Sequence, residues 1–335
     1  MIDARLRFAS SLLLLVACGD VASPMGGSSS EGTGSSGATL TTSTSAASTV
    51  AGTTGAADSS DSGGGPTTGD TSGSSGGPPV DMGVQPVDPC TETAFCEDFE
   101  DYTEVALADG QEFGPWRAAL SSGGALMDLD GTHTVSGDHA LHVVLDQGTE
   151  SGGRLFTNGG VPILADTPTH VYGRMMMYIA QNGTSVHWTF FGVSGEAEAS
   201  SPLAGNYASY IMSSLPRDGV NTYSFVDGLS GGPYYQDCWS QGMQPMPTDT
   251  WTCVSFEMDT LGRHLRMYND ADPTPIVSVD ETGQGCVSPA PGDSTWWGPE
   301  IDTFFVGGWS FHEMNAPLEL WIDDVVFDTA PVACP

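Results

Sequence analysis

The sequence has 335 residues and a formal net charge of −34 at pH 7, from 8 basic and 42 acidic residues. All the basic residues are arginines, because lysine does not occur in the chain. Nucleic-acid binding without sequence preference needs clustered cations, so this balance argues strongly against it. The lack of lysine also excludes catalysis through a lysine base or a lysine Schiff base.

The first segment is an export signal. Arg5 and Arg7 precede an apolar run, 8–17, that is too short to cross a bilayer as a mature helix. Cys18 follows directly, and small residues before such a cysteine resemble a bacterial lipoprotein signal. The resemblance implies cleavage of residues 1–17 and acylation of Cys18, against the alternative of an ordinary secretory peptide. We therefore expect an exported lipoprotein of the outer membrane or cell surface, which touches the membrane only through this lipid.

The cysteines support export. There are seven, and if Cys18 carries lipid, six remain in the C-terminal part. An even set in an exported chain predicts three disulfides, whose connectivity the sequence leaves open. Cys238 and Cys253 are the best single pair, because they would close a short Pro/Gly-rich loop. Metal binding by these cysteines is the weaker interpretation, since no Cys-x-x-Cys sequence occurs.

Composition divides the rest of the chain in two. Residues 18–89, from the lipid-bearing cysteine onward, are dominated by Gly, Ser, Thr, Ala and Asp, and predict a disordered tether. Residues 90–335 alternate short β-like runs with Gly/Pro/Asp/Asn clusters and contain no convincing long amphipathic helix. This pattern predicts one all-β domain, a two-sheet antiparallel β-sandwich, which we expect to be monomeric.

Two strong β-like runs, 171–180 and 185–191, flank an Asn-Gly step at 182–183. An Asn-Gly step between apolar runs predicts a β-hairpin. Because side chains alternate along a strand, Tyr172, Arg174 and Tyr178 should share one face. In the second run, His187, Thr189 and Phe191 should share one face.

Three short segments carry a family resemblance. They are an acidic, Phe-rich start at 95–101, a Ser-Gly-Asp-His sequence at 136–139 and a Trp-Ile-Asp-Asp-Val sequence at 321–325. These segments look like concanavalin A-like jelly rolls, a group with carbohydrate-binding modules and relatives of fungal glucuronan lyase and cellulose-induced protein. The resemblance implies a jelly roll whose first and last strands pair, and a polysaccharide, uronate-containing or neutral, as partner.

The resemblance also implies a Ca²⁺ ion, mainly structural, where the three segments meet. Glu100, Asp138 and Asp323 would supply carboxylates, and Ser136 would supply a carbonyl oxygen. Calcium takes six to eight oxygen ligands of these kinds. The alternative is that these residues are solvated turn acids.

In the lyase-like relatives, a Tyr-Gly-Arg strand and a later strand with His line the groove, which implies roles for Arg174 and His187. Lytic β-elimination requires a cation that neutralises the uronate carboxylate, a base for the C5 proton and an acid for the leaving oxygen. Arg174 suits the first role, His187 or a tyrosine the second, and Tyr178 or Tyr210 the third. The alternative is that Arg174 pairs with a local acid and His187 is structural.

Other functions stay open beside lysis. Trp296 and Trp297 in a loop, with Tyr172, could form a sugar platform in a non-catalytic carbohydrate-binding module. A structural or adhesive surface protein is a third hypothesis. A glycoside hydrolase is disfavoured, because Glu300 and Asp302 begin a jelly-roll glucanase pattern whose final acid is replaced by Phe305. Whether the protein is an enzyme is not decided by the sequence.

Overall fold

The computed structural model describes the C-terminal part of the chain. Described residues are Cys90 and 93–335, except 122, 158, 184–185, 216–218, 228–235, 284 and 288–293. The predicted signal peptide, Cys18 and the tether lie outside the described residues. No described helix is long and apolar enough to cross a membrane.

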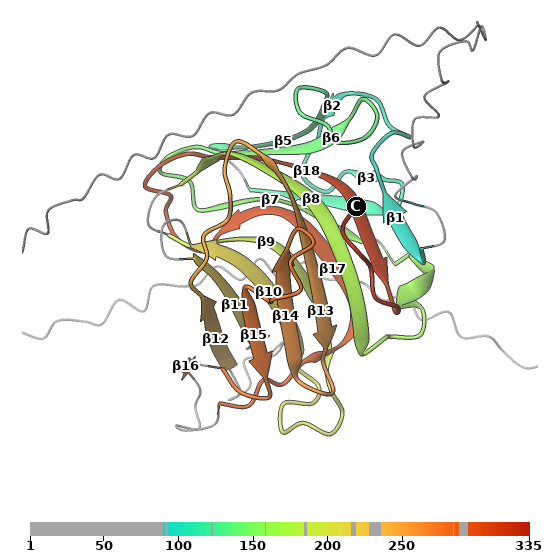
Figure 1. Ribbon diagram of the computed structural model, residues 1–335, viewed down its shortest axis with the longest axis vertical. Coiled ribbons are helices and arrows are strands. Elements are labelled where there is room, and N and C mark those ends of the chain that lie inside the picture. Colours follow the sequence, from blue (N-terminus) through green and yellow to red (C-terminus); the bar gives the residue numbers. More distant parts are fainter. Residues whose placement is uncertain are drawn as a thin grey trace, which may run out of the picture. The chain divides into compact units, whose positions relative to one another are not determined.

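The described residues form two antiparallel sheets stacked as a sandwich (Figure 1). Sheet A contains β1 (Phe95–Glu97), β2 (Val105–Ala106), β5 (Ala125–Asp130), β6 (Ala140–Leu145), β8 (His170–Asn182), β13 (Trp251–Asp259), β14 (His264–Asn269), β15 (Val277–Asp280) and β18 (Leu318–Asp328). Its order is β15-β14-β13-β8-β18-β6-β5-β2, with β1 paired to β18. The first and last strands therefore pair, as the family resemblance implied.

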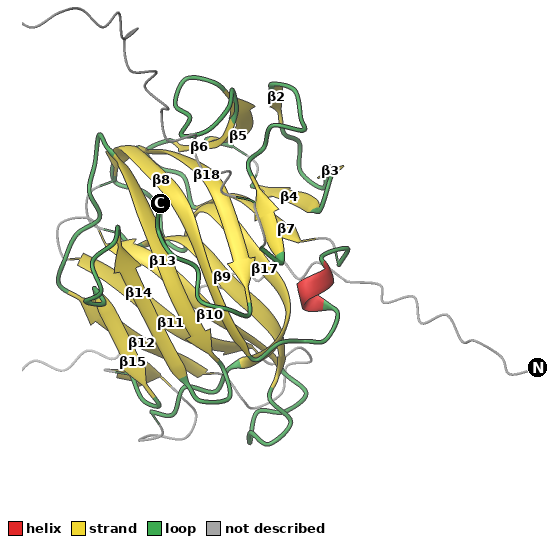
Figure 2. Ribbon diagram, turned by 45° about the vertical axis from the view of Figure 1, so that its right-hand side comes forward, coloured by secondary structure: helices red, strands yellow, loops and turns green. Residues whose placement is uncertain are grey.

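Sheet B contains β3 (Glu112–Phe113), β4 (Trp116–Leu120), β7 (Ser151–Thr157), β9 (Trp188–Ala197), β10 (Tyr207–Leu215), β11 (Gly219–Asp227), β12 (Gln236–Gly242), β16 (Gly285–Val287) and β17 (Pro299–Ser310). Its order is β16-β12-β11-β10-β9-β17-β7-β4-β3. One 3₁₀ turn, η1 (Pro162–Leu164), is the single helical element of the described part (Figure 2). The predicted all-β sandwich is confirmed.

The core lies between the inner faces of the two sheets. In β8, Val171, Met175 and Ile179 are at most 1% exposed and alternate with outward residues, as a half-buried strand requires. Phe191 of sheet B contacts Phe256 of sheet A with ring centroids 4.0 Å apart. Burial of such side chains is worth roughly 1.5–3 kcal/mol each, so this interface is the main stabilising element.

The predicted hairpin is wrong. β8 pairs with β13 and β18, whereas β9 pairs with β10 and β17, so the two runs lie in different sheets. The reason is burial: both runs are long and apolar on one face. Facing each other across the core hides those faces, which edge-to-edge pairing would not do. The chain therefore crosses between sheets after β8.

A β-bulge changes the faces of β9. Opposite β10, Thr189 pairs with Ser213 and Phe191 with Met212, so Phe190 is an extra residue. Phe190 and Phe191 are both fully buried in the core. The prediction that Phe191 shares a face with His187 and Thr189 is therefore wrong, whereas the shared outer face of Tyr172, Arg174 and Tyr178 in β8 is confirmed.

Three disulfides are present, as predicted, but the predicted Cys238–Cys253 pair is wrong. Cys238 in β12 of sheet B binds Cys286 in the adjacent β16, and Cys90 binds Cys96. Cys253 in β13 of sheet A binds Cys334 near the C-terminus. The short loop between Cys238 and Cys253 joins two different sheets, so the two side chains do not meet.

The disulfides should differ in their contributions to stability. Replacing Cys253 and Cys334 by serine removes a cross-link between residues 81 positions apart, whereas Cys90 and Cys96 are only 6 apart. Loop entropy predicts a loss of about 4–5 kcal/mol of unfolding free energy for the first pair and about 2 kcal/mol for the second. Urea unfolding of the two double variants measures this difference. Equal losses would contradict the entropic explanation.

Candidate functional site

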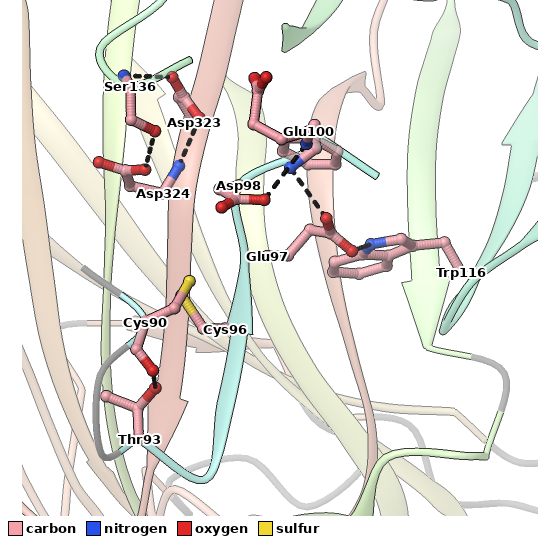
Figure 3. The surroundings of a disulfide bond; sticks show 11 residues. Cys90, Thr93, Cys96, Glu97, Asp98, Glu100, Trp116, Ser136, Asp323 and Asp324 are labelled. Carbon is pink, nitrogen blue, oxygen red and sulfur yellow. Dashed lines mark hydrogen bonds between the residues drawn. A yellow bond between two sulfur atoms is a disulfide. The ribbon is translucent and has the colours of Figure 1, made fainter. Parts of the chain in front are cut away.

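The three segments with the family resemblance do meet at one junction beside β1 and β18 (Figure 3). The Glu100 carboxylate accepts hydrogen bonds from the backbone N–H of Asp138 at 2.8 Å and of His139 at 2.7 Å. Asp323 Oδ2 accepts from the N–H of Val135 at 2.8 Å and of Ser136 at 3.3 Å. These contacts tie the 135–139 turn to both terminal strands.

The junction concentrates negative charge. Burial, with the neighbouring Asp324, raises the pKa of Asp323 to about 7. The carboxylates of Glu100 and Asp323 point at backbone N–H groups, and the described residues contain no group of three or more His, Cys, Asp or Glu placed to hold a metal ion. Both carboxylates therefore already accept hydrogen bonds from the backbone. Calcium binding by Glu100, Ser136, Asp138 and Asp323 therefore stays a prediction.

The predicted lyase residues are not brought together. Arg174 and Tyr178 lie on the outer face of sheet A, whereas His187 directly precedes β9 of sheet B. Tyr210 of β10 is fully buried, and its hydroxyl donates to the carbonyl oxygen of Trp296 at 2.8 Å. These four residues therefore cannot act on one sugar.

Arg174 and Tyr178 have structural surroundings. Burial lowers the pKa of Arg174, and the negative charge of Asp324 opposes that shift. The acid nearby agrees with the alternative in which Arg174 interacts with local carboxylate. Tyr178 stacks on His133, with centroids 4.2 Å apart, and contacts the edge of Trp321.

The predicted sugar platform is also rearranged. Trp296 is 0% exposed and belongs to the core, so it cannot stack on a glycan. Trp297 is half-buried beneath Arg263, whose guanidinium lies 4.2 Å from its ring centroid. Tyr172 is half-buried on sheet A and donates a hydrogen bond of 3.4 Å to Glu257. These three residues do not form one surface.

A different cluster lies on the outer face of sheet B, around Arg154 of β7. Its guanidinium lies 4.5 Å from the ring centroid of Phe305, 4.7 Å from Trp309 and 5.6 Å from Phe311. Its Nη2 donates to Thr189 Oγ1. Burial lowers the pKa of Arg154 to about 9, yet no carboxylate of the described residues forms an ion pair with it. Its Nε is buried without a hydrogen-bond partner.

Glycines create the space that Arg154 occupies. Arg154 is paired in register with Gly307 of β17, which has a φ of 142°. A Cβ atom at Gly307 would approach the Gly153 carbonyl oxygen to 2.3 Å and the Arg154 Cα to 2.9 Å. Only glycine permits this close approach of β17 to β7, at the position where the arginine lies among the aromatic rings.

His187 and Tyr223 form a second part of this cluster. Their ring centroids are 5.2 Å apart, and His312 lies 5.0 Å from His187. Burial, with the nearby His312, lowers the pKa of His187 to about 4, so His187 is neutral at neutral pH. Burial raises the pKa of Tyr223 to about 12, and the phenol accepts a 3.2 Å hydrogen bond from Asn221 Nδ2. A neutral imidazole and a protonated phenol therefore face each other.

The sequence indicated His187 as a candidate residue but not its neighbours Arg154 and Tyr223. Runs containing Arg154 and Tyr223 have β-like composition, but nothing local to them says which sheet they join. The signal that could have suggested Arg154 is its position after Gly152 and Gly153, since such glycines mark close backbone approach in a strand. Tyr223 has no comparable local signal.

Comparisons with known proteins give limited information. The sequence matches no protein-family model and no curated protein. Among solved structures, it is similar to cellulose-induced protein Cip1, with a TM-score of 0.47 and 17% identity over 72% of this chain and 100% of the other. It is also similar to an endo-beta-1,4-glucuronan lyase from the fungus Trichoderma reesei, with a TM-score of 0.45 and 10% identity over 71% of this chain and 96% of the other. For alginate lyase vAL-1 from Chlorella virus the TM-score is 0.39 and the identity 12%, over 64% of this chain and 93% of the other. All three TM-scores are below 0.5, so the sandwich assignment rests on the strand pairings above.

Arg154 should be dispensable for folding. Arg154→Met keeps an apolar chain among the rings and removes a buried charge, so the thermal unfolding midpoint should equal or exceed that of the wild type. Arg263→Met is the matched control, because Arg263 also covers an aromatic ring but pairs with the buried Glu198 at 3.0 Å. It should cost about 2–3 kcal/mol. A comparable loss for Arg154→Met would show that Arg154 is structural.

Proposed function

We propose that the outer face of sheet B binds a uronate-containing polysaccharide and cleaves it by β-elimination. The observation that carries this proposal is Arg154, a buried cation that no described carboxylate neutralises, beside a neutral His187 and a protonated Tyr223. An unpaired buried charge is costly, so a fold that keeps one favours an anionic ligand.

Arg154 supplies the cation that the chemistry needs. Its guanidinium is held by Thr189 Oγ1, and Thr189 lies two residues along the chain from His187, roughly 7 Å at strand spacing. This is about the span of one sugar ring. An arginine at this place can bind the uronate carboxylate in a bidentate manner and stabilise the charge that develops at C5.

His187 and Tyr223 divide the proton transfers. The neutral imidazole of His187 takes the proton from C5, and the electron pair of that C–H bond forms the C4=C5 double bond. The bond from C4 to the glycosidic oxygen breaks, and the Tyr223 hydroxyl gives its proton to the leaving oxygen. With centroids 5.2 Å apart, the two groups can reach the same ring. Asn221 Nδ2 orients the phenol.

A binding module without catalysis is the second candidate. Phe311, which is 40% exposed, lies near both Arg154 and His187 and offers a surface for sugar stacking. Binding to this surface requires no proton transfer. Retention on a glycan without cleavage would favour this candidate.

The location of the protein is part of the proposal. Three disulfides support an exported protein, because such bonds persist in oxidising compartments. We propose that the acylated Cys18 and the 18–89 tether hold the domain at the outer membrane or cell surface. We further propose calcium at the junction of Glu100, Ser136, Asp138 and Asp323, and no step of the mechanism depends on it.

Lysis is tested by ultraviolet absorbance of unsaturated uronates, with the oxidised protein and a panel of uronate-containing and neutral polysaccharides. Absorbance should grow with time on a uronate polymer. His187→Ala and Tyr223→Phe should each lower the rate at least about 100-fold, as expected for loss of a general base or acid. Arg174→Met is the control and should retain the rate. Loss of activity in Arg174→Met with retention in His187→Ala would contradict the proposed site.

The pH dependence gives an independent test. Because the pKa of His187 is lowered to about 4, the base stays neutral well below pH 6.5 and loses activity only as pH falls through about 4. The phenol of Tyr223 keeps its proton up to about pH 12. Plots of kcat/KM against pH should therefore be flat from about 5 to 8, with an acidic limb near 4. An acidic limb centred near 6.5 would rule out a buried His187 as the base.

A further inference from the structure

We infer that this site takes a mixed polysaccharide, with a uronate over Arg154 and His187 and an uncharged sugar stacked on Trp239 of β12. The inference rests on the proposed function and adds the order of charged and neutral sugars in the substrate. Trp239 is 37% exposed, in contrast to Trp116, Trp188 and Trp296, which are fully buried. An exposed indole beside a polar site is a typical sugar-binding surface.

Trp239 lies directly beside the proton-transfer pair. It is paired in register with Tyr223 of β11, so the two side chains share the outer face of sheet B. Directly opposed residues have Cβ atoms about 4.5–5.5 Å apart. A sugar on Trp239 is therefore the neighbour of the sugar held between His187 and Tyr223.

The disulfide beside Trp239 keeps it in place. Cys238, the preceding residue, points into the core and binds Cys286 of β16. Trp239 itself is paired with Gly285 of the same strand. A side chain on a cross-linked strand loses little freedom when a ligand binds, so the stacking energy is retained as affinity.

Charged residues are distributed unevenly across the outer face of sheet B. Arg117 of β4 and Arg154 of β7 lie at one side, and Arg117 is paired in register with Phe156, which contacts Phe305. At the other side, β10, β11, β12 and β16 contain no arginine, and the chain contains no lysine. Arg217, between β10 and β11, lies outside the described residues.

An acid lies on the Trp239 side. Asp237 is two residues before Trp239 on the same strand face, and its charge acts on the phenol of Tyr223. A uronate carboxylate over Trp239 would meet this like charge, whereas the hydroxyls of a neutral sugar can donate hydrogen bonds to the Asp237 carboxylate.

The face is long enough for more than one sugar. The Arg154 guanidinium contacts Thr189 of β9, and three strand steps separate β9 from β12, through β10 and β11. At about 4.8 Å per step this is roughly 14 Å, more than one sugar ring spans. The face therefore has room for two neighbouring sugars, so a charged and a neutral sugar can occupy different positions.

The test compares two polymers at equal uronate concentration and physiological salt, with the full-length oxidised protein. One polymer contains uronate alone, and the other alternates uronate with a neutral sugar. We expect kcat/KM at least about 10-fold higher on the alternating polymer. Trp239→Ala should lower that value about 10-fold, from the loss of one aromatic contact, and Trp239→Tyr should restore most of it. Asp237→Asn should raise activity on the uronate-only polymer and leave the alternating one nearly unchanged.

Trp251→Phe on sheet A is the control, and unfolding midpoints exclude misfolding. A higher kcat/KM on the uronate-only polymer would overturn the inference. So would a Trp239→Ala variant that cleaves each polymer as fast as the wild type does. In that case His187-dependent lysis would leave the proposed function intact. If the wild type neither cleaves nor binds either polymer, both the proposed function and the inference fail.

Discussion

The apolar contact between the two sheets determines where everything else lies. Aromatic rings from both sheets meet in the core, among them Phe304 of β17 and Phe327 of β18, whose centroids are 4.6 Å apart. Burial on this scale outweighs local turn preferences, so the chain crosses from β8 to β9 although an Asn-Gly step lies between them. Each crossing sends neighbouring segments to opposite surfaces. This separates Arg174 from His187, and brings Arg154 and Tyr223, far apart in sequence, to one face.

Stability and the proposed function make opposite demands on the outer face of sheet B. The rings of Phe305, Trp309 and Phe311 solvate the Arg154 cation in part, but they do not neutralise it. In contrast, Arg263 combines a ring contact with an ion pair to the buried Glu198. Arg263 is thus neutralised within the fold, whereas no described carboxylate neutralises Arg154. Buried charges that cost stability in this way are common in sites that bind or transform ligands.

The local sequence pattern predicted where the strands lie, but it did not predict which strands and cysteines pair. Alternation placed Tyr172, Arg174 and Tyr178 on one outer face, because that property depends only on the strand itself. Pairing depends on contacts between distant residues, so the Cys238 partner and the position of His187 relative to Arg174 could not be obtained from neighbours in sequence. The bulge at Phe190 is a further case, since one extra residue reverses the faces that follow it. Trp296 shows the same limit, because its loop folds back into the core.

Under the proposed function, the large negative charge of the chain makes the site selective among acidic polysaccharides. A net charge of −34 repels a polyanion at distances where salt does not screen it. A cation in a desolvated aromatic cage acts strongly, but only over a short range. Arg154 can therefore offset the repulsion for a carboxylate placed directly on it, and it does little for carboxylates several strands away. Under the proposed function, an acidic protein with one buried cation among the described residues of this face would discriminate by the spacing of charges along a polysaccharide, which a uniformly basic groove would not do.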